Sequence, residues 1–542
     1  MTKQIQNKLN IKDIFFMFSK TIIIYNLLYF SDYIFHLYNK NYLHPSITKF
    51  NTTLFVLIFA ILLLKKYWVR ILLLSLILFS TLIEYFYFQY FGTYVQAIGF
   101  YQIIMNTKET FHVLGDELNT MYIPFIIVLS IIFSIFILKR FLKVRSFRSN
   151  TVGIILILGL FLFSTYSTYS KLHSKSGKLW HKDAQEILPM PGILSSINYL
   201  RAFEYFLVGI LPKKILSNNM DIFKPLAVPM SKKEIEDNNV IFIIGESLRA
   251  KQLGILGYKL NTTPKLAKIK KLKYKTVYSS GTMTKVSVSS LLNRVKYPGT
   301  TMQITKQDNN LFKLAKDHGY KTYFYSWQNN SQLNVIQNFM GRKYIDNYAS
   351  REMLKRRIKH YSDYDDNLLT ALKWLDLSKG KNFIVLHERG SHATYSKQYP
   401  KEYSVFKKAY DNTVLYTDYV ISEIIKHVGE HTKKPTYVIF TSDHGELLHE
   451  HGRNGHGWFF PEVYKVPFIF YAANVSTDKI SFENIQTHFD VSNLVTNFLG
   501  YKVEIKKENT IYVNGSDVDA LAGYLKIKVD NNNSEIKVKK FR

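Results

Sequence analysis

The apolar residues divide the chain near residue 170. Before that point, long apolar and aromatic runs alternate with short charged loops. A helix needs about 20 apolar residues to cross a bilayer. The runs predict five membrane-spanning helices, at 15–38, 53–64, 68–90, 121–138 and 151–168. The second run is the weakest, because Lys65 and Lys66 interrupt it, so this span either begins near 44–47 or is short.

The charges between the runs predict an orientation. Lysine and arginine concentrate before the first run, around 65–70 and in 139–148, while the alternate loops carry fewer of them. Loops rich in lysine and arginine stay on the cytoplasmic side. The N-terminus is therefore predicted to be cytoplasmic, and five crossings would leave everything after about residue 170 outside the cytoplasm.

The remainder of the chain alternates short apolar strands with helices. This alternation is typical of a largely parallel sheet covered by helices. We expect an α/β domain over 236–525, an amphipathic connector over 171–235 and a peripheral basic tail over 526–542. Strands are predicted at 240–244, 321–325, 383–386, 437–441 and 467–471, and helices at 310–316, 366–375 and 410–427.

The amino-acid composition excludes some kinds of site and partner. The 542 residues contain no cysteine, which excludes disulfides, thiolate metal ligands and cysteine nucleophiles. The net charge of +30 suggests an anionic neighbour such as phospholipid or a phosphorylated glycan, although a lysine-rich surface without a specific partner fits equally well. No nucleic-acid-binding motif is present, so nucleic acid is not an expected partner.

Several predicted strands end in residues that bind metals. Glu246 follows the first strand, His392 lies shortly after 383–386, and Asp443 and His444 follow 437–441, with His456 in a glycine-rich turn beyond them. The carboxyl ends of parallel strands meet at one edge of a sheet, where α/β folds bind their ligands. A single histidine is more often structural, but the whole set predicts a site for a divalent metal such as zinc.

A nucleophile is expected in the segment 281–290, which holds several hydroxyls at the start of a predicted helix. A helix N-terminus offers backbone N–H groups to a phosphate. A metal-bound hydroxyl loses its proton easily, as metal-bound water does. The alternative is an ordinary Ser/Thr helix cap.

These motifs, in this order, resemble the phosphoethanolamine transferases, inner-membrane enzymes of the alkaline phosphatase/sulfatase superfamily. A five-span anchor before a periplasmic domain is similar to the same family. The matching motifs are Gly245–Arg249, Gly257-Tyr258, Thr262–Pro264, Gly281–Thr284 with Ser287-Val288, Trp327 with Asn329–Ser331, Gly390–His392, Tyr410–Asn412, Asp418, Ser442–Glu446 and His456-Gly457.

The resemblance implies a role for each matching residue. Thr284 corresponds to the nucleophile. The implied zinc ligands are Glu246, Thr284, Asp443 and His444. His392 and His456 would contact the phosphate group or a second zinc ion, and Glu109 matches a donor-site glutamate. The implied location is the bacterial inner membrane, with the catalytic domain in the periplasm.

The reaction implied by the family is a two-step transfer. Zinc-activated Thr284 takes phosphoethanolamine from phosphatidylethanolamine, and an envelope glycan such as lipid A or the lipopolysaccharide core accepts it. The first alternative is a phosphoglycerol transferase of the same superfamily. The second is a membrane-bound phosphodiesterase or sulfatase, although the Cys/Ser-x-Pro-x-Arg signature of sulfatases is missing. The third is a non-catalytic membrane protein that has kept the fold.

Overall fold

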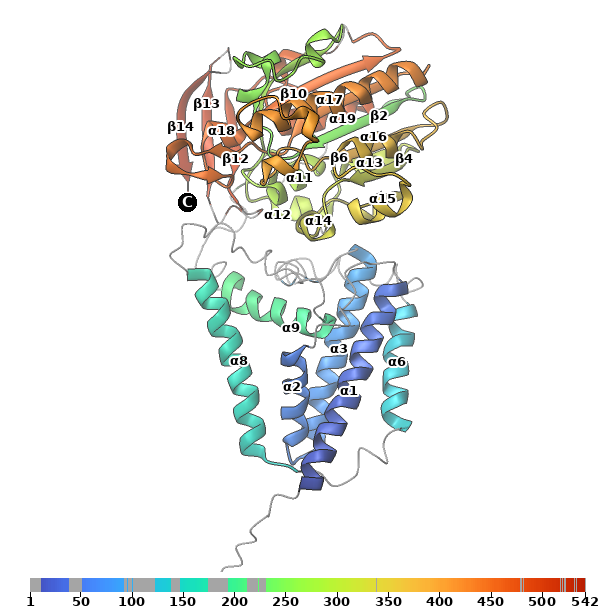
Figure 1. Cartoon of the computed structure of the whole chain (residues 1–542), viewed down its shortest axis with the longest axis vertical. Helices are drawn as coiled ribbons and strands as arrows, with labels where there is room; N and C mark the ends of the chain where they lie inside the picture. Colours follow the sequence, from blue (N-terminus) through green and yellow to red (C-terminus); the bar gives the residue numbers. More distant parts are fainter. Residues whose placement is uncertain are drawn as a thin grey trace, which may run out of the picture. The chain divides into compact units, whose positions relative to one another are not determined.

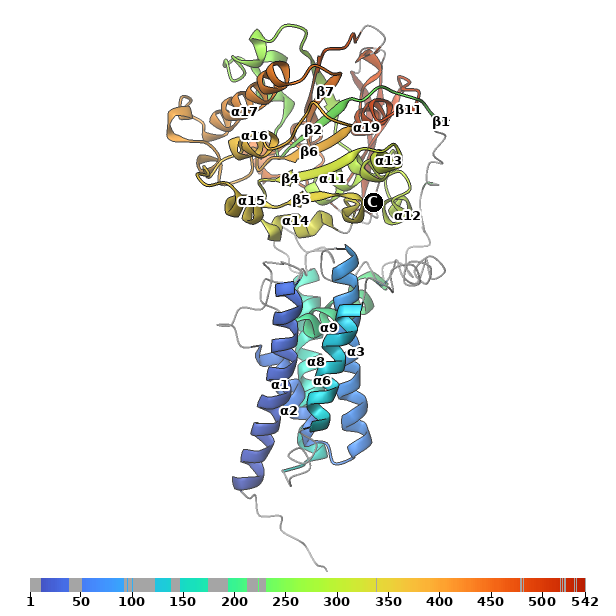
Figure 2. The ribbon, with the colours of Figure 1, turned by 90° about the vertical axis from the view of Figure 1, so that its right-hand side faces the viewer.

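The computed structural model divides into two compact units, residues 1–218 and 219–542. The structure describes residues 11–38, 51–91, 95, 100, 122–137, 147–173, 194–211, 223 and most of 231–541, with gaps at 338, 478–479, 481, 517, 519, 521–522, 531 and 533. Figures 1 and 2 show a helical first unit and a second unit built around a sheet.

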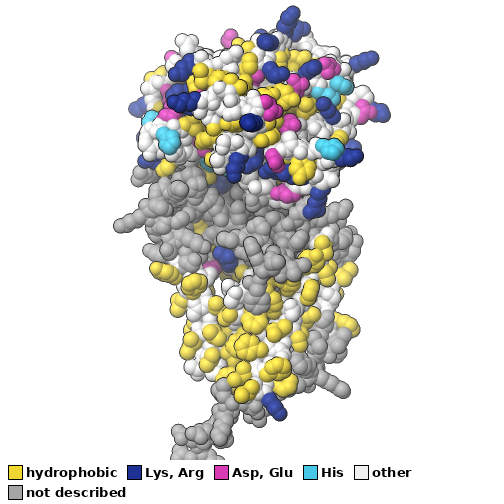
Figure 3. All heavy atoms as spheres, in the orientation of Figure 1, with side chains coloured by type: hydrophobic (Ala, Val, Ile, Leu, Met, Phe, Trp, Pro, Cys, Tyr) yellow, Lys and Arg dark blue, Asp and Glu magenta, His cyan; other side chains and the backbone are white. Residues whose placement is uncertain are grey.

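The first unit contains a helix at each of the five predicted positions. Their outer faces expose large apolar side chains, including Phe15, Phe30 and Phe163 at 65%, 58% and 72% exposure. Apolar side chains cover this unit in Figure 3. The helices are α1 (Ile11–Tyr38), α2 (Thr52–Leu63), α3 (Tyr67–Phe91), α6 (Tyr122–Ile137) and α8 (Asn150–His173).

The prediction of five spans is confirmed only in part. Within the described residues, two helices are long and apolar enough to cross a membrane, Ile11–Phe35 and Tyr67–Phe88. Helix α2 has 12 residues and α6 has 16. At 1.5 Å per residue they reach about 18 and 24 Å, less than the roughly 30 Å of a bilayer core. Helix α2 ends early because two lysines follow it.

The described part of the predicted connector contains a helix that packs within the first unit. This helix is α9 (Ser195–Tyr205). Asn198 Nδ2 donates to Glu84 Oε1 at 2.8 Å, and the Ser195 backbone N–H donates to Asp32 Oδ2 at 3.1 Å. The predicted domain boundaries at 170 and 235 remain predictions.

The second unit is built on a seven-stranded sheet in the order β3-β10-β7-β2-β6-β4-β5. Strands β7, β2, β6, β4 and β5 are parallel, while β10 runs antiparallel to both β7 and β3. The sheet is therefore largely parallel, as predicted, with β10 as the strand that makes it mixed. The strands are β2 (Asn239–Gly245), β3 (Lys273–Tyr278), β4 (Lys321–Ser326), β5 (Asn347–Ala349), β6 (Asn382–His387), β7 (Thr436–Ser442) and β10 (Lys465–Ala473).

Helices cover both faces of this sheet, as the sequence predicted. Alternate residues of the central strand β2 point to opposite sides, as strand geometry requires. Phe242 packs with α11, α13 and α19 on one side, and Ile243 packs with α16 and α17 on the other. The helices of this unit are α11 (Thr284–Leu292), α12 (Thr301–Lys306), α13 (Leu311–Asp317), α14 (Asn330–Gln337), α15 (Arg351–Arg357), α16 (Asp366–Leu372), α17 (Ala409–His431), α18 (Pro461–Tyr464) and α19 (His488–Phe498).

The residues predicted as a peripheral basic tail, 526–542, have regular structure. Most of it forms strands of a second sheet, ordered β12 (Thr510–Asn514), β13 (Tyr524–Val529) and β14 (Glu535–Phe541). Ile527 is fully buried and Val529 is 2% exposed. In β13 lysines alternate with buried apolar residues, so this strand is basic in composition but packs one apolar face on the core. In β14 the alternate apolar residues Ile536 and Val538 are 69% and 46% exposed.

Two short pairs of strands complete the unit. The hairpin of β8 (Leu447–Leu448) and β9 (Asn454–Gly455) carries the turn before His456. Strand β1 (Ser231–Lys232) pairs with β11 (Tyr501–Lys502). The β8–β9 hairpin brings the chain back toward the ends of β2 and β7.

Candidate active site

The site begins where two neighbouring parallel strands end. Gly245, the last residue of β2, is paired with Ser442, the last residue of β7. Glu246 and Asp443 therefore leave the sheet side by side, and His444 follows. One ligand atom from each of the three lies within 4.8 Å of the others, and all three side chains are buried. The predicted convergence of strand ends is confirmed for these residues.

Thr284 lies against this triad. It is the first residue of α11, so the helix N-terminus points at the site. Its hydroxyl Oγ1 donates to Glu246 Oε2 at 3.2 Å and lies 3.2 Å from His444 Nε2. His444 Nε2 is itself 3.2 Å from Asp443 Oδ2. The four residues for which the resemblance implied metal binding thus form one cluster.

Neighbouring groups orient each member of the triad. The His444 Nδ1 atom lies 2.9 Å from the Gly445 carbonyl oxygen. With the proton on Nδ1, the lone pair of Nε2 is directed at the carboxylates, which is how imidazole binds a metal. Asp443 Oδ1 accepts the backbone N–H of His444 at 2.7 Å and that of Ser247 at 3.0 Å. Among the described residues Asp443 Oδ2 has no hydrogen-bond partner.

The electrostatics of the triad fit a cation. Burial raises the pKa of Asp443 to about 6 and lowers the pKa of His444 to about 4. A buried carboxylate oxygen without a partner is costly. A divalent ion at the triad would satisfy that oxygen and favour the ionised carboxylate and the neutral imidazole. One imidazole, two carboxylates and a hydroxyl are all ligands that zinc accepts.

Two further predicted histidines lie beside the triad. The ring centroids of His444 and His456 are 4.3 Å apart, and those of His456 and His392 are 6.3 Å apart. His456 Nδ1 lies 3.6 Å from Glu446 Oε1. Burial lowers the pKa of His456, but its contact with Glu446 outweighs this effect, so the pKa is raised. Glu109, the remaining predicted site residue, lies outside the described residues.

The structure adds positioning residues to which the sequence assigned no role. Ser247 Oγ donates to Glu246 Oε1 at 2.8 Å, and Gln328 Nε2 donates to Glu246 Oε2 at 2.8 Å. The Tyr410 hydroxyl donates to the Ser247 carbonyl at 2.6 Å. Only the position of Ser247, directly after Glu246, could have indicated such a role. Gln328 and Tyr410 are distant in sequence and meet the site through the fold.

Comparisons with known proteins agree with this architecture. The Sulfatase family model matches residues 238–501. The Kdo(2)-lipid A phosphoethanolamine 7''-transferase of Escherichia coli K12 is 32% identical over 261 residues, which are 44% of this chain and 45% of that protein. The enzyme of the same name from Salmonella typhimurium is 27% identical over 70% of this chain and 72% of its own length. Phosphoethanolamine transferase EptA of Helicobacter pylori is 28% identical over 76% of this chain and 77% of its own length.

Solved structures are more distant. The integral membrane protein lipooligosaccharide phosphoethanolamine transferase A from Neisseria meningitidis is 18% identical, with a TM-score of 0.45, over 89% of this chain and 95% of that one. The periplasmic domain of EptC from Escherichia coli, solved in complex with zinc, is 20% identical, with a TM-score of 0.44. The match covers 54% of this chain and 94% of that one. Likeness at this level carries no functional argument.

The sheet and the triad at its edge both lie within residues 238–501, the segment that matches the Sulfatase family model. The relatives that the chain matches over most of its length, at 27% and 28% identity, are named phosphoethanolamine transferases, the family that the sequence motifs resemble.

Proposed function

We propose that the protein transfers phosphoethanolamine from phosphatidylethanolamine to an envelope glycan, lipid A or the lipopolysaccharide core, through a phosphorylated Thr284. The observation that carries the proposal is the position of the Thr284 hydroxyl, 3.2 Å from both Glu246 Oε2 and His444 Nε2. The names of the Escherichia coli and Salmonella typhimurium relatives, which specify Kdo(2)-lipid A, support the acceptor class. The name phosphatidylethanolamine transferase, given to a relative 26% identical to this chain, supports the donor.

The proposed cofactor is zinc, held by Glu246, Asp443, His444 and the Thr284 hydroxyl. When bound, it would lower the pKa of the threonine hydroxyl and neutralise charge on the phosphoryl oxygens. Residues of the chain position the hydroxyl and the phosphate. Glu246 holds Thr284 through a hydrogen bond, and the α11 N-terminus adds a favourable dipole for a phosphate.

In the first proposed step, Thr284 Oγ1 forms a bond to phosphorus and the bond from phosphorus to the diacylglycerol oxygen breaks. The proton of the Thr284 hydroxyl passes to Glu246 Oε2, which accepts its hydrogen bond. His456, with its pKa raised beside Glu446, can supply the proton that the leaving oxygen gains. His392, on the outer side of His456, can stabilise the charged phosphoryl oxygens. In the second step, an acceptor oxygen attacks phosphorus and releases Thr284.

We further propose that the first unit anchors the enzyme in the bacterial inner membrane, with the second unit in the periplasm. Two helices long enough to cross a bilayer and an apolar outer surface support the anchor. The charge distribution between the runs supports the orientation. Anchoring keeps the enzyme in the bilayer that holds its lipid donor.

The decisive experiment is intact-mass analysis of the purified full-length protein after incubation with phosphatidylethanolamine. We expect an adduct of about 123 Da, the mass of a covalent phosphoethanolamine group, and its loss in Thr284→Ala. Ser287→Ala is the matched control, because its hydroxyl lies in the same helix but donates to the Met283 carbonyl. Diacylglycerol release without an adduct would indicate hydrolysis or a short-lived intermediate. Absence of both products would refute the ethanolamine donor and favour phosphatidylglycerol.

A further inference from the structure

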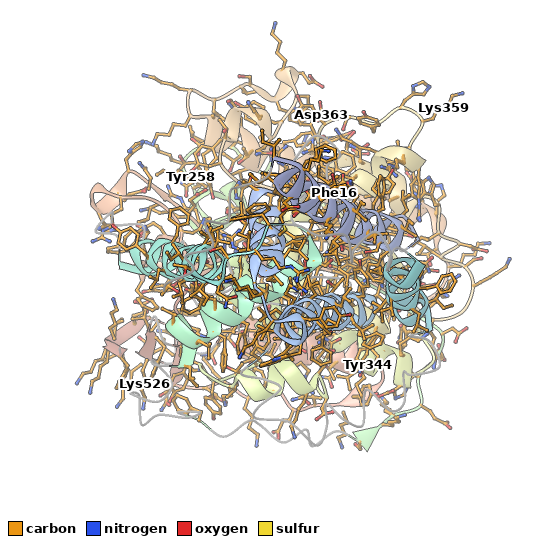
Figure 4. All side chains as sticks on the ribbon, turned by 90° about the horizontal axis from the view of Figure 1, so that it is seen from below. Phe16, Tyr258, Tyr344, Lys359, Asp363 and Lys526 are labelled. Carbon is orange, nitrogen blue, oxygen red and sulfur yellow. The ribbon has the colours of Figure 1, made fainter. Side chains whose placement is uncertain are left out.

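The outward face of the C-terminal sheet carries two pairs of lysines facing each other. In the register of β13 and β14, Lys526 is paired with Lys539 and Lys528 with Lys537. These four residues are called the lysine quartet. Lys528, Lys537 and Lys539 are exposed and Lys526 is half-buried. In Figure 4, the Lys526 label lies at the periphery, among side chains that end in nitrogen and point away from the ribbon.

This arrangement is electrostatically unfavourable by itself. Side chains directly opposite on antiparallel strands lie about 5 Å apart at Cβ, and like charges there destabilise the sheet. No member of the quartet forms an ion pair with another described residue. Two ammonium groups instead lie over aromatic rings, Lys526 Nζ at 5.9 Å from the Tyr512 centroid and Lys539 Nζ at 4.8 Å from that of Phe541. The face therefore presents concentrated positive charge without internal neutralisation.

Protection of a sheet edge explains only half of the quartet. Strand β14 is an edge strand, and lysines commonly prevent such strands from pairing with other chains. This explanation covers Lys537 and Lys539. Strand β13, however, is the central strand of this sheet, so its lysines guard no edge. Lys526 and Lys528 require another reason for facing the lysines of β14.

Aromatic side chains pack beside the quartet on the same face of the sheet. Tyr524 and Phe541 stack with centroids 4.8 Å apart, and Phe223 packs on Tyr512 and Tyr524 at 5.1 and 5.9 Å. The opposite face of β12 and β13 is apolar and buried, with Ile511, Val513, Leu525 and Ile527 in its core, whereas Ile536 and Val538 of β14 are exposed. The four ammonium groups are thus presented on one face of a packed sheet.

We propose that the lysine quartet docks the second unit onto a bilayer surface that carries anionic phosphate headgroups. Charge complementarity is the main argument, because no described residue forms an ion pair with the quartet and the whole chain has a net charge of +30. The bilayer is the favoured occupant because the same chain carries helices able to cross it, which gives the surface a high effective concentration. The inference rests on the membrane anchoring of the proposed function but not on its catalytic chemistry.

The test uses the absence of cysteine from the chain. A Thr510→Cys variant places one polarity-sensitive dye on the quartet's face of the sheet, because Thr510 of β12 is paired with Lys528 and is half-buried. Full-length protein with this label, in a Thr284→Ala background that prevents turnover, is compared in lipid nanodiscs of phosphatidylcholine with and without phosphatidylglycerol. We expect blue-shifted emission only with the anionic lipid. The shift should disappear in 1 M salt, where the screening length falls to about 3 Å.

Neutralisation of the quartet is the matched variant. Lys→Gln at Lys526, Lys528, Lys537 and Lys539 should abolish the shift without lowering the melting temperature, because like-charge repulsion is removed. Lys→Gln at four exposed lysines of the same unit, Lys251, Lys265, Lys379 and Lys506, should leave the shift unchanged. A dye at Val405→Cys, a position 64% exposed, should respond equally to both kinds of nanodisc.

Two results would overturn the proposal. One is identical emission at residue 510 in both kinds of nanodisc. The other is a shift produced by a soluble phosphorylated glycan but not by the anionic bilayer, which would assign the quartet to a different ligand. Because the background is inactive, either result leaves the Thr284 chemistry to its own test, and failure of the mass adduct leaves this measurement unaffected.

Discussion

At the scale of single residues, Ser247 connects the two carboxylates of the triad. Its hydroxyl donates to Glu246 and its backbone N–H donates to Asp443. Both bonds are formed because Ser247 adopts a left-handed conformation, with φ of 57°. Few residues other than glycine accept this conformation without strain. The hydrogen bond from Tyr410 to its carbonyl helps to hold it there.

We therefore expect loss of the Ser247 hydroxyl to weaken zinc binding about 10- to 100-fold, as loss of partners that orient metal ligands generally does. Ser247→Ala tests the hydroxyl alone, because serine and alanine both carry a Cβ in the left-handed backbone. Ser247→Gly also removes the Cβ and relieves the backbone strain. Zinc affinity is measured by competition with a chromogenic chelator.

Ser492→Ala is the matched control, because this buried serine donates to the Leu291 and His488 carbonyls, away from the triad. Parent-like affinity in both Ser247 variants would rule out the positioning role.

The sequence predicted the triad itself but not the residues that orient it. Glu246, Asp443 and His444 could be found because each directly follows an apolar run, and strand ends converge. Gln328 could not, because it meets Glu246 across 82 residues of sequence. Its contact depends on how β4 is aligned with the central strand, and no local pattern encodes that register.

At the scale of secondary-structure elements, helix α19 begins with a buried acidic group. The Thr487 side chain and Asp490 form a reciprocal capping box at its N-terminus. Asp490 Oδ2 accepts the backbone N–H groups of Gln486 and Thr487. Burial nevertheless dominates and raises the pKa of Asp490 to about 6.

This shift predicts a pH-dependent stability. A carboxyl group with a raised pKa in the folded state stabilises the fold below its unfolded value, about 3.9, and that contribution is lost as pH rises through about 6. Since one pKa unit corresponds to about 1.4 kcal/mol, the change is at most about 3 kcal/mol. Asp490→Asn should flatten the dependence of the unfolding free energy on pH between 4 and 6, measured by chemical denaturation.

Asp376→Asn provides the comparison, because Asp376 has its pKa lowered to about 2 by hydrogen bonds from Ser378. That variant should leave the slope between pH 4 and 6 unchanged. An unaltered slope in Asp490→Asn would mean that another group controls this range.

The longer elements were predictable and the short ones were not. Helix α17 and strands β2, β6 and β7 carry strong apolar periodicity, and the structure confirms the helix or strand predicted at each. Strand β5 has three residues and leaves no recognisable pattern. The antiparallel direction of β10 was missed because a buried strand reads the same in either direction. The basic residues of β14 outweighed its alternation, so it was interpreted as a tail.

At the scale of the whole molecule, the proposed metal joins parts of the chain that are otherwise remote. The triad and Thr284 come from the ends of β2 and β7 and from the start of α11. Without a cation, Glu246 and Asp443 would be two buried carboxylates in close proximity, a costly arrangement. Metal binding should therefore stabilise the second unit as a whole rather than a single loop.

We expect chelation of the metal to lower the melting temperature of the second unit by several degrees. A ligand present at 100 times its dissociation constant contributes about 2.7 kcal/mol. Differential scanning calorimetry of the full-length protein, with and without a chelator, measures the change.

Readdition of zinc should restore the transition, and an Asp443→Ala variant should be insensitive to the chelator. A chelator effect of equal size in that variant would indicate binding elsewhere.

The pairing of β2 with β7 also constrains when the protein can mature. Ser247 and Asp443, joined by a hydrogen bond, are 196 residues apart in sequence. Strand β2 is synthesised long before its partner exists, and during that interval no complete triad is available to an ion. If the triad holds the proposed metal, the newly made domain passes through a metal-free stage, and capture of the ion belongs to the last events of its biogenesis.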